Sequence, residues 1–305
     1  MIDNVTFVVI GKNEALNLSR CFNSILKITD NVIFVDSDSS DNSISIAKDH
    51  NIKKIIRVKA NYGTPALSRS VGAKEVETEF MQFLDGDMEI ENTWVTYGVE
   101  YLKKNRQVAA VHGYKKVYKH DLINYHILSD KKDWQADYLQ GAFLIRRECY
   151  INAGGFDYRF HGEEERDLYI RLKANKYQVW YLHQLMSSHY DFKKKNTFYI
   201  LFSGIEAGMW IPLLKSIKNN RMGSYLFVYK ALLLPLFCEL STLATLFLGL
   251  HKFILYGLAI QAMEFLYCLL INRRGYFLVW KAAILNTHKT VHILKRKVNY
   301  TTEYH

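Results

Sequence analysis

Two groups of acidic residues are the part of this sequence best suited to chemistry. Asp85 and Asp87 flank Gly86 directly after the apolar run 80–84, and a second group occupies residues 163–167. Two carboxylates one residue apart, at the end of a buried strand, can hold a divalent cation against a diphosphate. An acid-x-acid triplet alone is common in solvated turns. With the second acidic group further along the chain, we predict that the triplet is the centre of a site.

The elements that would position these acids alternate between strand and helix patterns. Continuous apolar runs predict strands at 5–10, 31–35, 55–58 and 80–84 and a fifth from residue 109, with helices between them. Later patterns predict helices at 94–104 and 164–174 and strands at 142–146 and 179–182. Such alternation implies an α/β fold of Rossmann type, with a mostly parallel sheet flanked by helices.

Parallel sheets bind ligands at the carboxyl ends of their strands. Short polar side chains and glycine in these loops let a base and a ribose approach the backbone. We therefore expect the residues that bind a nucleotide here: Ile10, Asn13, Glu14, Asp36, Ser37, Asp85 and Gly86. The sequence has neither the Gly-x-Gly-x-x-Gly fingerprint nor a Walker loop, which argues against a nicotinamide enzyme. A diphosphate would therefore be neutralised by a cation and by side chains such as Arg69.

Composition and charge narrow the class of partner. The chain of 305 residues has a net charge of +10, which favours anionic partners. The basic residues gather after Lys193 and flank hydrophobic segments, a pattern of membrane surfaces more than of nucleic-acid binding. The four cysteines are far apart in sequence and form no CxxC pair, so we expect a reducing compartment.

The hydrophobic character changes in the last third of the chain. Segments 231–250 and 253–271 are each long enough to cross a bilayer, although each contains an acidic residue that is costly in lipid. A soluble helical hairpin packed on the catalytic domain is the alternative. We expect a catalytic domain at 1–195 and a helical, membrane-associated region at 196–305, on the cytoplasmic face of the membrane.

Four motifs together resemble glycosyltransferase family 2, the inverting enzymes with the GT-A fold. They are residues 5–14, residues 35–41, residues 83–87 and the stretch from Gly154 to Leu172, and they occur in the family's order. The resemblance covers roughly residues 5–189. It implies a nucleotide-sugar donor (UDP, GDP or dTDP), Mg or Mn, and transfer to a hydroxyl of a lipid-linked or cell-surface glycan. The Gln-x-x-Arg-Trp motif of processive polysaccharide synthases is missing, which favours a single addition.

The resemblance also implies roles for individual residues. Asp36 matches the acid that contacts the base or ribose, and Arg69 a basic position near the diphosphate. Asp85 and Asp87 match the DxD pair, with His189 resembling a late histidine that completes the metal shell in some members. Glu165 stands where the family has its catalytic Asp, and the run of three glutamates leaves Glu164 as the other candidate base.

Simpler interpretations stay open for several of these residues. The acids at 163–165 could be the first turn of a helix, where the dipole favours negative charge, and Arg69 could only cap or pair on a helix. A sugar nucleotidyltransferase also uses strand-end acids and a cation, although residues 11–14 are a poor version of its glycine-rich basic loop. A catalytically inactive, membrane-anchored binding protein is the non-enzyme alternative.

Overall fold

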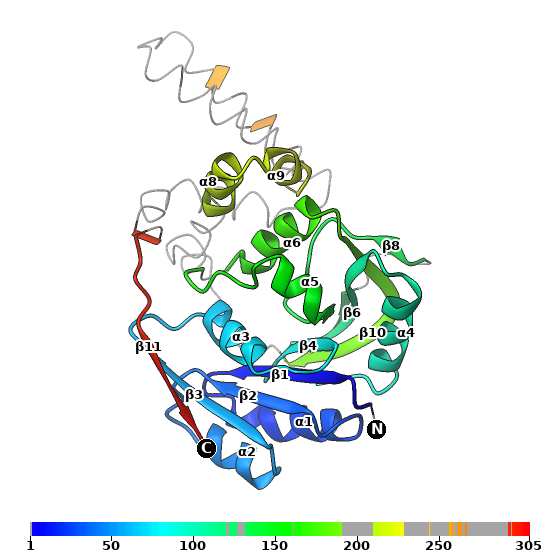
Figure 1. Cartoon of the computed structure of the whole chain (residues 1–305), viewed down its shortest axis with the longest axis vertical. Helices are drawn as coiled ribbons and strands as arrows, with labels where there is room; N and C mark the ends of the chain where they lie inside the picture. Colours follow the sequence, from blue (N-terminus) through cyan, green and yellow to red (C-terminus); the bar gives the residue numbers. More distant parts are fainter. Residues whose placement is uncertain are drawn as a thin grey trace. The chain divides into compact units, whose positions relative to one another are not determined.

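A computed structural model of the chain shows how these segments fold (Figure 1). The structure describes residues 2–119, 122–126, 132–160, 162–190, 210–228 and 295–305, with isolated residues between 244 and 293. The chain forms two compact units. Unit 1 comprises Met1–Lys194 and Arg296–His305, and unit 2 comprises Lys195–Lys295. The expected 196–305 region therefore needs a correction, because its last ten residues belong to unit 1.

The first half of unit 1 follows the expected alternation of strands and helices. Its elements are β1 (Val5–Gly11), α1 (Ala15–Leu26), β2 (Val32–Asp36), α2 (Ser43–Asp49), β3 (Lys54–Ala60), α3 (Pro65–Lys74) and β4 (Phe80–Asp85). β1 lies parallel to β2 and to β4, and β2 lies parallel to β3. All four strands therefore present their carboxyl ends at one edge of the sheet.

The second half of unit 1 contains strands of both directions. Its elements are β5 (Met88–Ile90), α4 (Trp94–Lys104), β6 (Val108–Lys119), β7 (Leu122–His126), β8 (Trp134–Gln135), β9 (Phe143–Arg146), α5 (Arg147–Asn152), α6 (Glu164–Ala174) and β10 (Gln178–Tyr190). β10 and β6 are parallel, but β9 runs antiparallel to β4 and β6, and β5 and β8 run antiparallel to β10. The expectation of a mostly parallel sheet is wrong here, and the sheet is mixed.

A strand from the end of the chain completes the sheet. β11 (Tyr300–Tyr304) pairs antiparallel with β3, so the order across the sheet is β11-β3-β2-β1-β4-β9-β6-β10-β5. Figure 1 shows β11 in red alongside β3. An edge strand with unpaired backbone groups invites further pairing. Here the chain covers the β3 edge with its own last residues.

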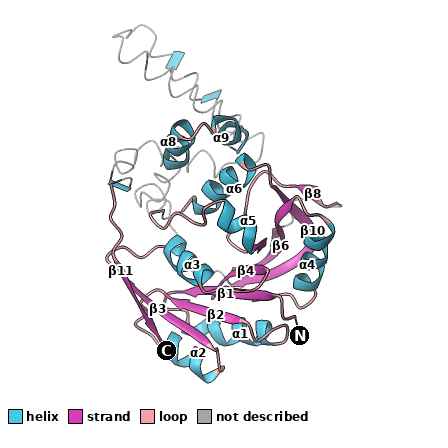
Figure 2. Ribbon diagram, in the orientation of Figure 1, coloured by secondary structure: helices cyan, strands magenta, loops and turns pink. Residues whose placement is uncertain are grey.

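Helices cover both faces of the sheet because the strands alternate their side chains (Figure 2). Phe7 and Val9 of β1 share a core with the buried face of α1, which includes Leu18 and Phe22. The intervening Val8 faces α3 on the other side, where a Cβ at Gly72 would lie 2.5 Å from its Cγ1. α3 therefore packs closely on the sheet, which fixes the position of its first turns.

Unit 2 contains two described helices, α8 (Trp210–Lys218) and α9 (Met222–Val228). The hydrophobic segments 231–250 and 253–271 lie almost wholly outside the described residues. Within the described part of the chain, no helix combines the length and apolar character needed to cross a bilayer.

Candidate active site

The acidic triplet lies at the carboxyl end of β4, as expected. Asp85 pairs in register with Ile10 of the neighbouring strand, and the Gly86 N–H donates to the Ile10 carbonyl at 2.8 Å. A side chain at residue 86 would crowd this turn, since a Cβ would lie 3.0 Å from Leu18 and 3.3 Å from the Ile10 oxygen. Glycine thus lets the strand end turn tightly, with Asp85 and Asp87 held by a buried strand.

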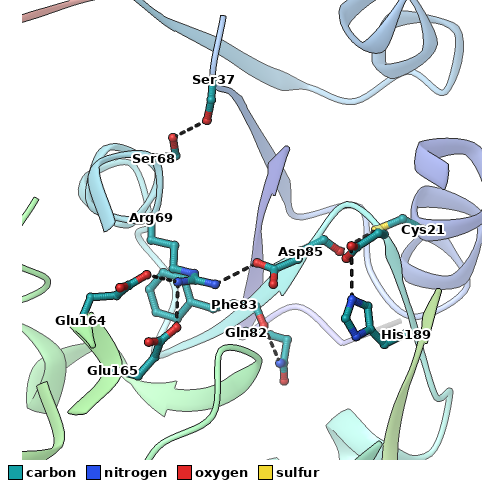
Figure 3. A network of polar contacts seen from close by, with 11 residues as sticks. Cys21, Ser37, Ser68, Arg69, Gln82, Phe83, Asp85, Glu164, Glu165 and His189 are labelled. Atoms are coloured by element: carbon teal, nitrogen blue, oxygen red, sulfur yellow. Dashed lines mark hydrogen bonds and ion pairs between the residues drawn. The ribbon is translucent and has the colours of Figure 1, made fainter. Parts of the chain in front are cut away.

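Arg69 joins the two acidic groups. Its Nη2 donates to Asp85 Oδ1 at 2.8 Å, and its Nη1 donates to Glu164 Oε1 and to Glu165 Oε1, both at 2.9 Å. Figure 3 shows the guanidinium pointing between these carboxylates. The Arg69 side chain is only 4% exposed. The structure therefore brings the acids near 86 and near 164 together, and Arg69 sits among them as their counter-charge.

Local structure explains why Arg69 reaches this position. Thr64 is the N-cap of α3, and its hydroxyl oxygen accepts from the Leu67 N–H at 3.0 Å. Pro65 follows in the first turn, where its missing N–H costs nothing. Ser68, next to Arg69, hydrogen-bonds the Ser37 hydroxyl at 2.7 Å. α3 is thus tied to the end of β2 on one side while Arg69 faces the acids on the other.

The glutamates occupy the first turn of α6, where the helix dipole favours negative charge. Glu163 has a left-handed backbone (φ 67°) and binds Arg166, whereas Glu164 and Glu165 turn to Arg69. The Glu165 side chain is 18% exposed and that of Glu164 is 3% exposed. Burial, together with the negative charge of Glu165, raises the pKa of Glu164 to about 8 despite the opposing effect of Arg69. Glu165 is therefore the more accessible carboxylate.

Asp87 and His189 meet at the end of β10. His189 Nε2 lies 3.2 Å from Asp87 Oδ2, and the Tyr190 N–H donates to the Asp87 carbonyl. Among the described residues, the buried Asp87 Oδ1 atom has no hydrogen-bond partner. An unmatched buried carboxylate oxygen is unfavourable unless a proton donor or cation meets it.

A divalent cation fits the carboxylates of Asp85 and Asp87 with His189 beside them, since Mg and Mn bind carboxylate and phosphate oxygens. Within the described ranges, no three His, Cys, Asp or Glu side chains are grouped closely enough to hold a metal ion by themselves. Asp85 also has Arg69 as a close partner. The protein would therefore supply only part of the coordination shell, and a diphosphate would supply further oxygens.

A cavity of about 330 Å³ opens between the strand ends and the start of α3. Its lining includes seven residues expected from the sequence: Ile10, Glu14, Ser37, Arg69, Asp85, Gly86 and Asp87. Five others complete it: Gly11, Lys12, Gly63, Thr64 and Pro65. Gly63 and the N-cap Thr64 directly precede α3, and Pro65 is its first residue. The sequence indicates a helix start there but contains no ligand-binding motif, so these residues were not expected in the site.

Asn13 and Asp36 are not among the described residues that line this cavity. Asn13 has a left-handed backbone (φ 55°), and its side-chain oxygen accepts from the Ser40 N–H at 2.9 Å. Asp36 is fully buried, and its Oδ2 accepts from the Ser39 N–H at 2.8 Å. Both side chains therefore hold the loop after β2. Among the described residues the buried Asp36 Oδ1 atom has no hydrogen-bond partner, so the predicted contact of Asp36 with a base or ribose stays a prediction.

Two further residues lie at the site without having been expected. A Cβ at Gly141 would be 3.4 Å from both Arg69 Nη2 and Glu165 Oε1, so the backbone passes close to these charged groups. Lys115 of β6 is the second. Burial lowers its pKa, while the charges of Asp85 and Glu165 oppose that shift. Lys115 is one of 40 lysine and arginine residues, and no motif around it in the sequence indicates that it belongs to a site.

Comparisons with known proteins point to one enzyme family. A family model described as glycosyl transferase family 2 matches residues 6–164. An uncharacterized glycosyltransferase of Rickettsia conorii is 37% identical over 57 residues, 19% of this chain and 20% of the relative. A second, of Rickettsia felis, is 38% identical over 56 residues. The aligned stretch thus spans about a fifth of the length of these curated relatives.

Solved structures share the fold at low sequence identity. S. aureus TarS 1–349, solved in complex with UDP-GlcNAc, has a TM-score of 0.61 and 14% identity, with 95% of this chain and 92% of that chain covered. GalNAc-T7, solved with UDP, GalNAc and Mn²⁺, has a TM-score of 0.57 and 16% identity, with 74% and 56% covered. These neighbours support a fold of the GT-A type.

Proposed function

The chain belongs to glycosyl transferase family 2, and we propose that it moves a sugar from a nucleotide-sugar donor to an acceptor hydroxyl with inversion. The observation that carries this proposal is the joint contact of Arg69 with Asp85 and Glu165 beside a cavity formed by strand ends. One guanidinium thereby links the cation-binding strand end with the carboxylate that faces the acceptor. The sheet supplies one group and α6 the other.

On the donor side, the cavity takes the nucleotide part of a UDP-, GDP- or dTDP-sugar. UDP is the first choice for a test, because both structural neighbours named above were solved with UDP or a UDP-sugar. Asp87, Asp85 and His189 would hold Mg or Mn, which neutralises charge on a departing diphosphate. Arg69 has three carboxylate partners, so we assign it to positioning the acids and not to binding phosphate alone.

On the acceptor side, Glu165 is the proposed general base. The acceptor oxygen attacks the anomeric carbon from the face opposite the diphosphate. The new C–O bond forms as the bond to the diphosphate oxygen breaks, and the diphosphate leaves with the electron pair. Glu165 receives the hydroxyl proton, for which its partial exposure suits it. Glu164 is more deeply buried and acts through Arg69 and Glu165.

We further propose that unit 2 associates with the cytoplasmic face of a membrane, where a lipid-linked or cell-surface glycan would be the acceptor. In α8, Leu214 and Ile217 are exposed one turn apart, next to the exposed Lys218. Exposed apolar and basic side chains on one helix favour anionic lipid. The full chain should sediment with vesicles containing phosphatidylserine more than with neutral vesicles, and an Ile217→Asp variant should lose this difference. Equal sedimentation with both vesicles would contradict the proposal.

The catalytic assignment is tested by three variants of adjacent or paired acids. Glu165→Gln should bind UDP with Mn²⁺ as the unaltered chain does, and should lower kcat by about 10²- to 10⁴-fold, the contribution of a general base. Asp87→Ala should lose the Mn²⁺ dependence of UDP binding in calorimetry. Glu163→Gln is the matched control, because Glu163 binds Arg166 and not Arg69, and it should retain turnover.

Turnover retained in Glu165→Gln would overturn the base assignment. Release of pyrophosphate from a nucleoside triphosphate would instead identify a nucleotidyltransferase. Failure of every nucleoside diphosphate sugar to bind would favour a binding protein that has lost catalysis.

A further inference from the structure

The last ten residues, 296–305, form a segment that we name the C-terminal strap. Its strand part, β11, pairs with the last five residues of β3, from Tyr300 opposite Ala60 to Tyr304 opposite Ile56. Side chains reinforce the pairing, with Glu303 on Lys59 at 2.6 Å and the Tyr304 hydroxyl on Glu75 at 3.1 Å. The strap is thus docked at its far end by contacts remote from the cavity.

The near end of the strap contacts a different segment, residues 61–64, which we name the rim loop. Asn61 makes three hydrogen bonds to the strap: its N–H to the Asn299 carbonyl, its Nδ2 to the Lys297 carbonyl, and its Oδ1 from the Asn299 N–H. The Arg296 guanidinium carbon lies 3.3 Å from the centre of the Tyr62 ring. The strap therefore holds the first two residues of the rim loop.

The rim loop continues directly into the cavity. Gly63 and Thr64 line it, together with Pro65. The Thr64 hydroxyl donates to the Tyr158 carbonyl at 2.9 Å, and Arg296 Nη1 donates to the neighbouring Arg159 carbonyl at 3.0 Å. Arg296 thereby contacts both segments that meet at Thr64. Thr64 in turn caps the helix that carries Arg69.

Within the rim loop, Gly63 is the position with open space around it. A Cβ on Gly63 would meet no described atom within 4 Å. A glycine in open space samples many backbone conformations, and ordering such a loop upon binding lowers ligand affinity. Contacts that order the loop before the ligand arrives remove that cost. The Arg296 and Asn61 contacts supply such order from outside the cavity.

We infer that the C-terminal strap is a positioning element of the donor cavity, with Arg296 fixing the rim loop so that the nucleotide meets a preformed wall. The inference rests on the proposed function for the identity of the ligand. The competing interpretation is that the strap only covers the β3 edge. In that case its near and far contacts would matter for stability alone.

The test compares variants at the two ends of the strap in the full chain. Arg296→Ala should weaken UDP binding in the presence of Mn²⁺ about tenfold and raise the donor KM by a similar factor, with kcat within about twofold. Arg296→Lys keeps a cation over the Tyr62 ring and should recover part of the loss. Tyr304→Phe removes the far contact with Glu75 and should leave UDP binding unchanged. Calorimetry and initial rates at saturating acceptor give these values.

A ligand-independent measurement separates the inference from the proposed function. Without nucleotide, amide hydrogen exchange in peptides covering residues 61–67 should be faster in Arg296→Ala than in Tyr304→Phe. Unchanged exchange and unchanged UDP affinity in a folded Arg296→Ala protein would overturn the inference. Equal loss of affinity in both variants would also overturn it, because it would show a merely structural strap. If the unaltered chain binds no UDP, the proposed nucleotide fails, and the exchange result alone decides whether Arg296 orders the rim loop.

Discussion

The two halves of the unit 1 sheet build their parts of the site differently. In the parallel half (β3, β2, β1 and β4), register places Asp85 beside Ile10 at adjoining strand ends. In the mixed half (β9, β6, β10 and β5), the groups come from within β6, from the end of β10 and, beyond the sheet, from the first turn of α6. Under the proposed function, the strand ends would give a fixed edge for a nucleotide, and the helix start would offer a carboxylate to a second substrate. Such a site needs a link between its two halves, and Arg69, which contacts acids from both halves, is that link.

Removing that link should have the largest effect. Arg69→Ala leaves Asp85, Glu164 and Glu165 close together without their buried counter-charge. We expect a loss of about 3–5 kcal/mol in the free energy of unfolding, the usual cost of breaking a buried ion pair, together with loss of activity. Urea denaturation followed by circular dichroism measures the first. Lysine has no planar fork with which to reach both acidic groups. The stability and the activity of Arg69→Lys should therefore lie between those of Arg69→Ala and those of the unaltered chain. A loss below about 1 kcal/mol for Arg69→Ala would show that Arg69 is not the link.

Glycine substitutions compare the packing of the two halves. A Cβ at Gly113 of β6 would lie 2.3 Å from the Gln184 carbonyl oxygen, while one at Gly72 of α3 would lie 2.5 Å from a methyl group of Val8. A backbone oxygen yields less than a side chain, so we expect about 3 kcal/mol of destabilisation for Gly113→Ala and about 1–2 kcal/mol for Gly72→Ala. Gly63→Ala, with open space around it, is the control for thermal unfolding. The reverse order would mean that the mixed half is the more adaptable one.

A pH dependence is also expected in the mixed half. The folded protein raises the pKa of Glu164 from 4.5 to about 8, so it binds this proton more tightly than the unfolded chain does. The stability linked to the proton is complete below pH 4.5 and is lost as the pH rises through about 8. Glu164→Gln removes the titration, so its Tm should fall less than that of the unaltered chain between pH 5 and 8, without divalent metal. Parallel Tm curves would contradict the shift.

The sequence predicts the parallel half well because each strand there is a continuous apolar run bounded by polar turns. It also predicts α4 and α6, whose bounds agree with the expected 94–104 and 164–174. It missed β5 and β8, which have three and two residues, too few for a periodic pattern. β11 was missed because Tyr300–Tyr304 is a polar, partly exposed strand, and its partner β3 lies far away in sequence.

The site shows the same division. The acids near 86 and 164 carried a recognisable spacing, and the structure brings them together through Arg69. Lys115 and Gly141 carried none, since their importance comes from chain segments that meet only in the folded sheet. Asn13 and Asp36 stay predictions. Polar residues at a strand end can bind a ligand or hold their own loop, and one oxygen of each side chain here accepts from Ser40 or Ser39. The other carboxylate oxygen of Asp36 is buried without a partner among the described residues.

The return of the chain to β3 has one more consequence. Residues 195–295 form unit 2. The chain enters unit 2 after β10 and returns to unit 1 at Arg296, so unit 2 is joined to unit 1 at both of its ends. A single proteolytic nick within it would sever the polypeptide and still leave both fragments held together, because β11 remains hydrogen-bonded to its neighbour. Only a second cut, or the peeling away of that one edge strand, would release the inserted piece.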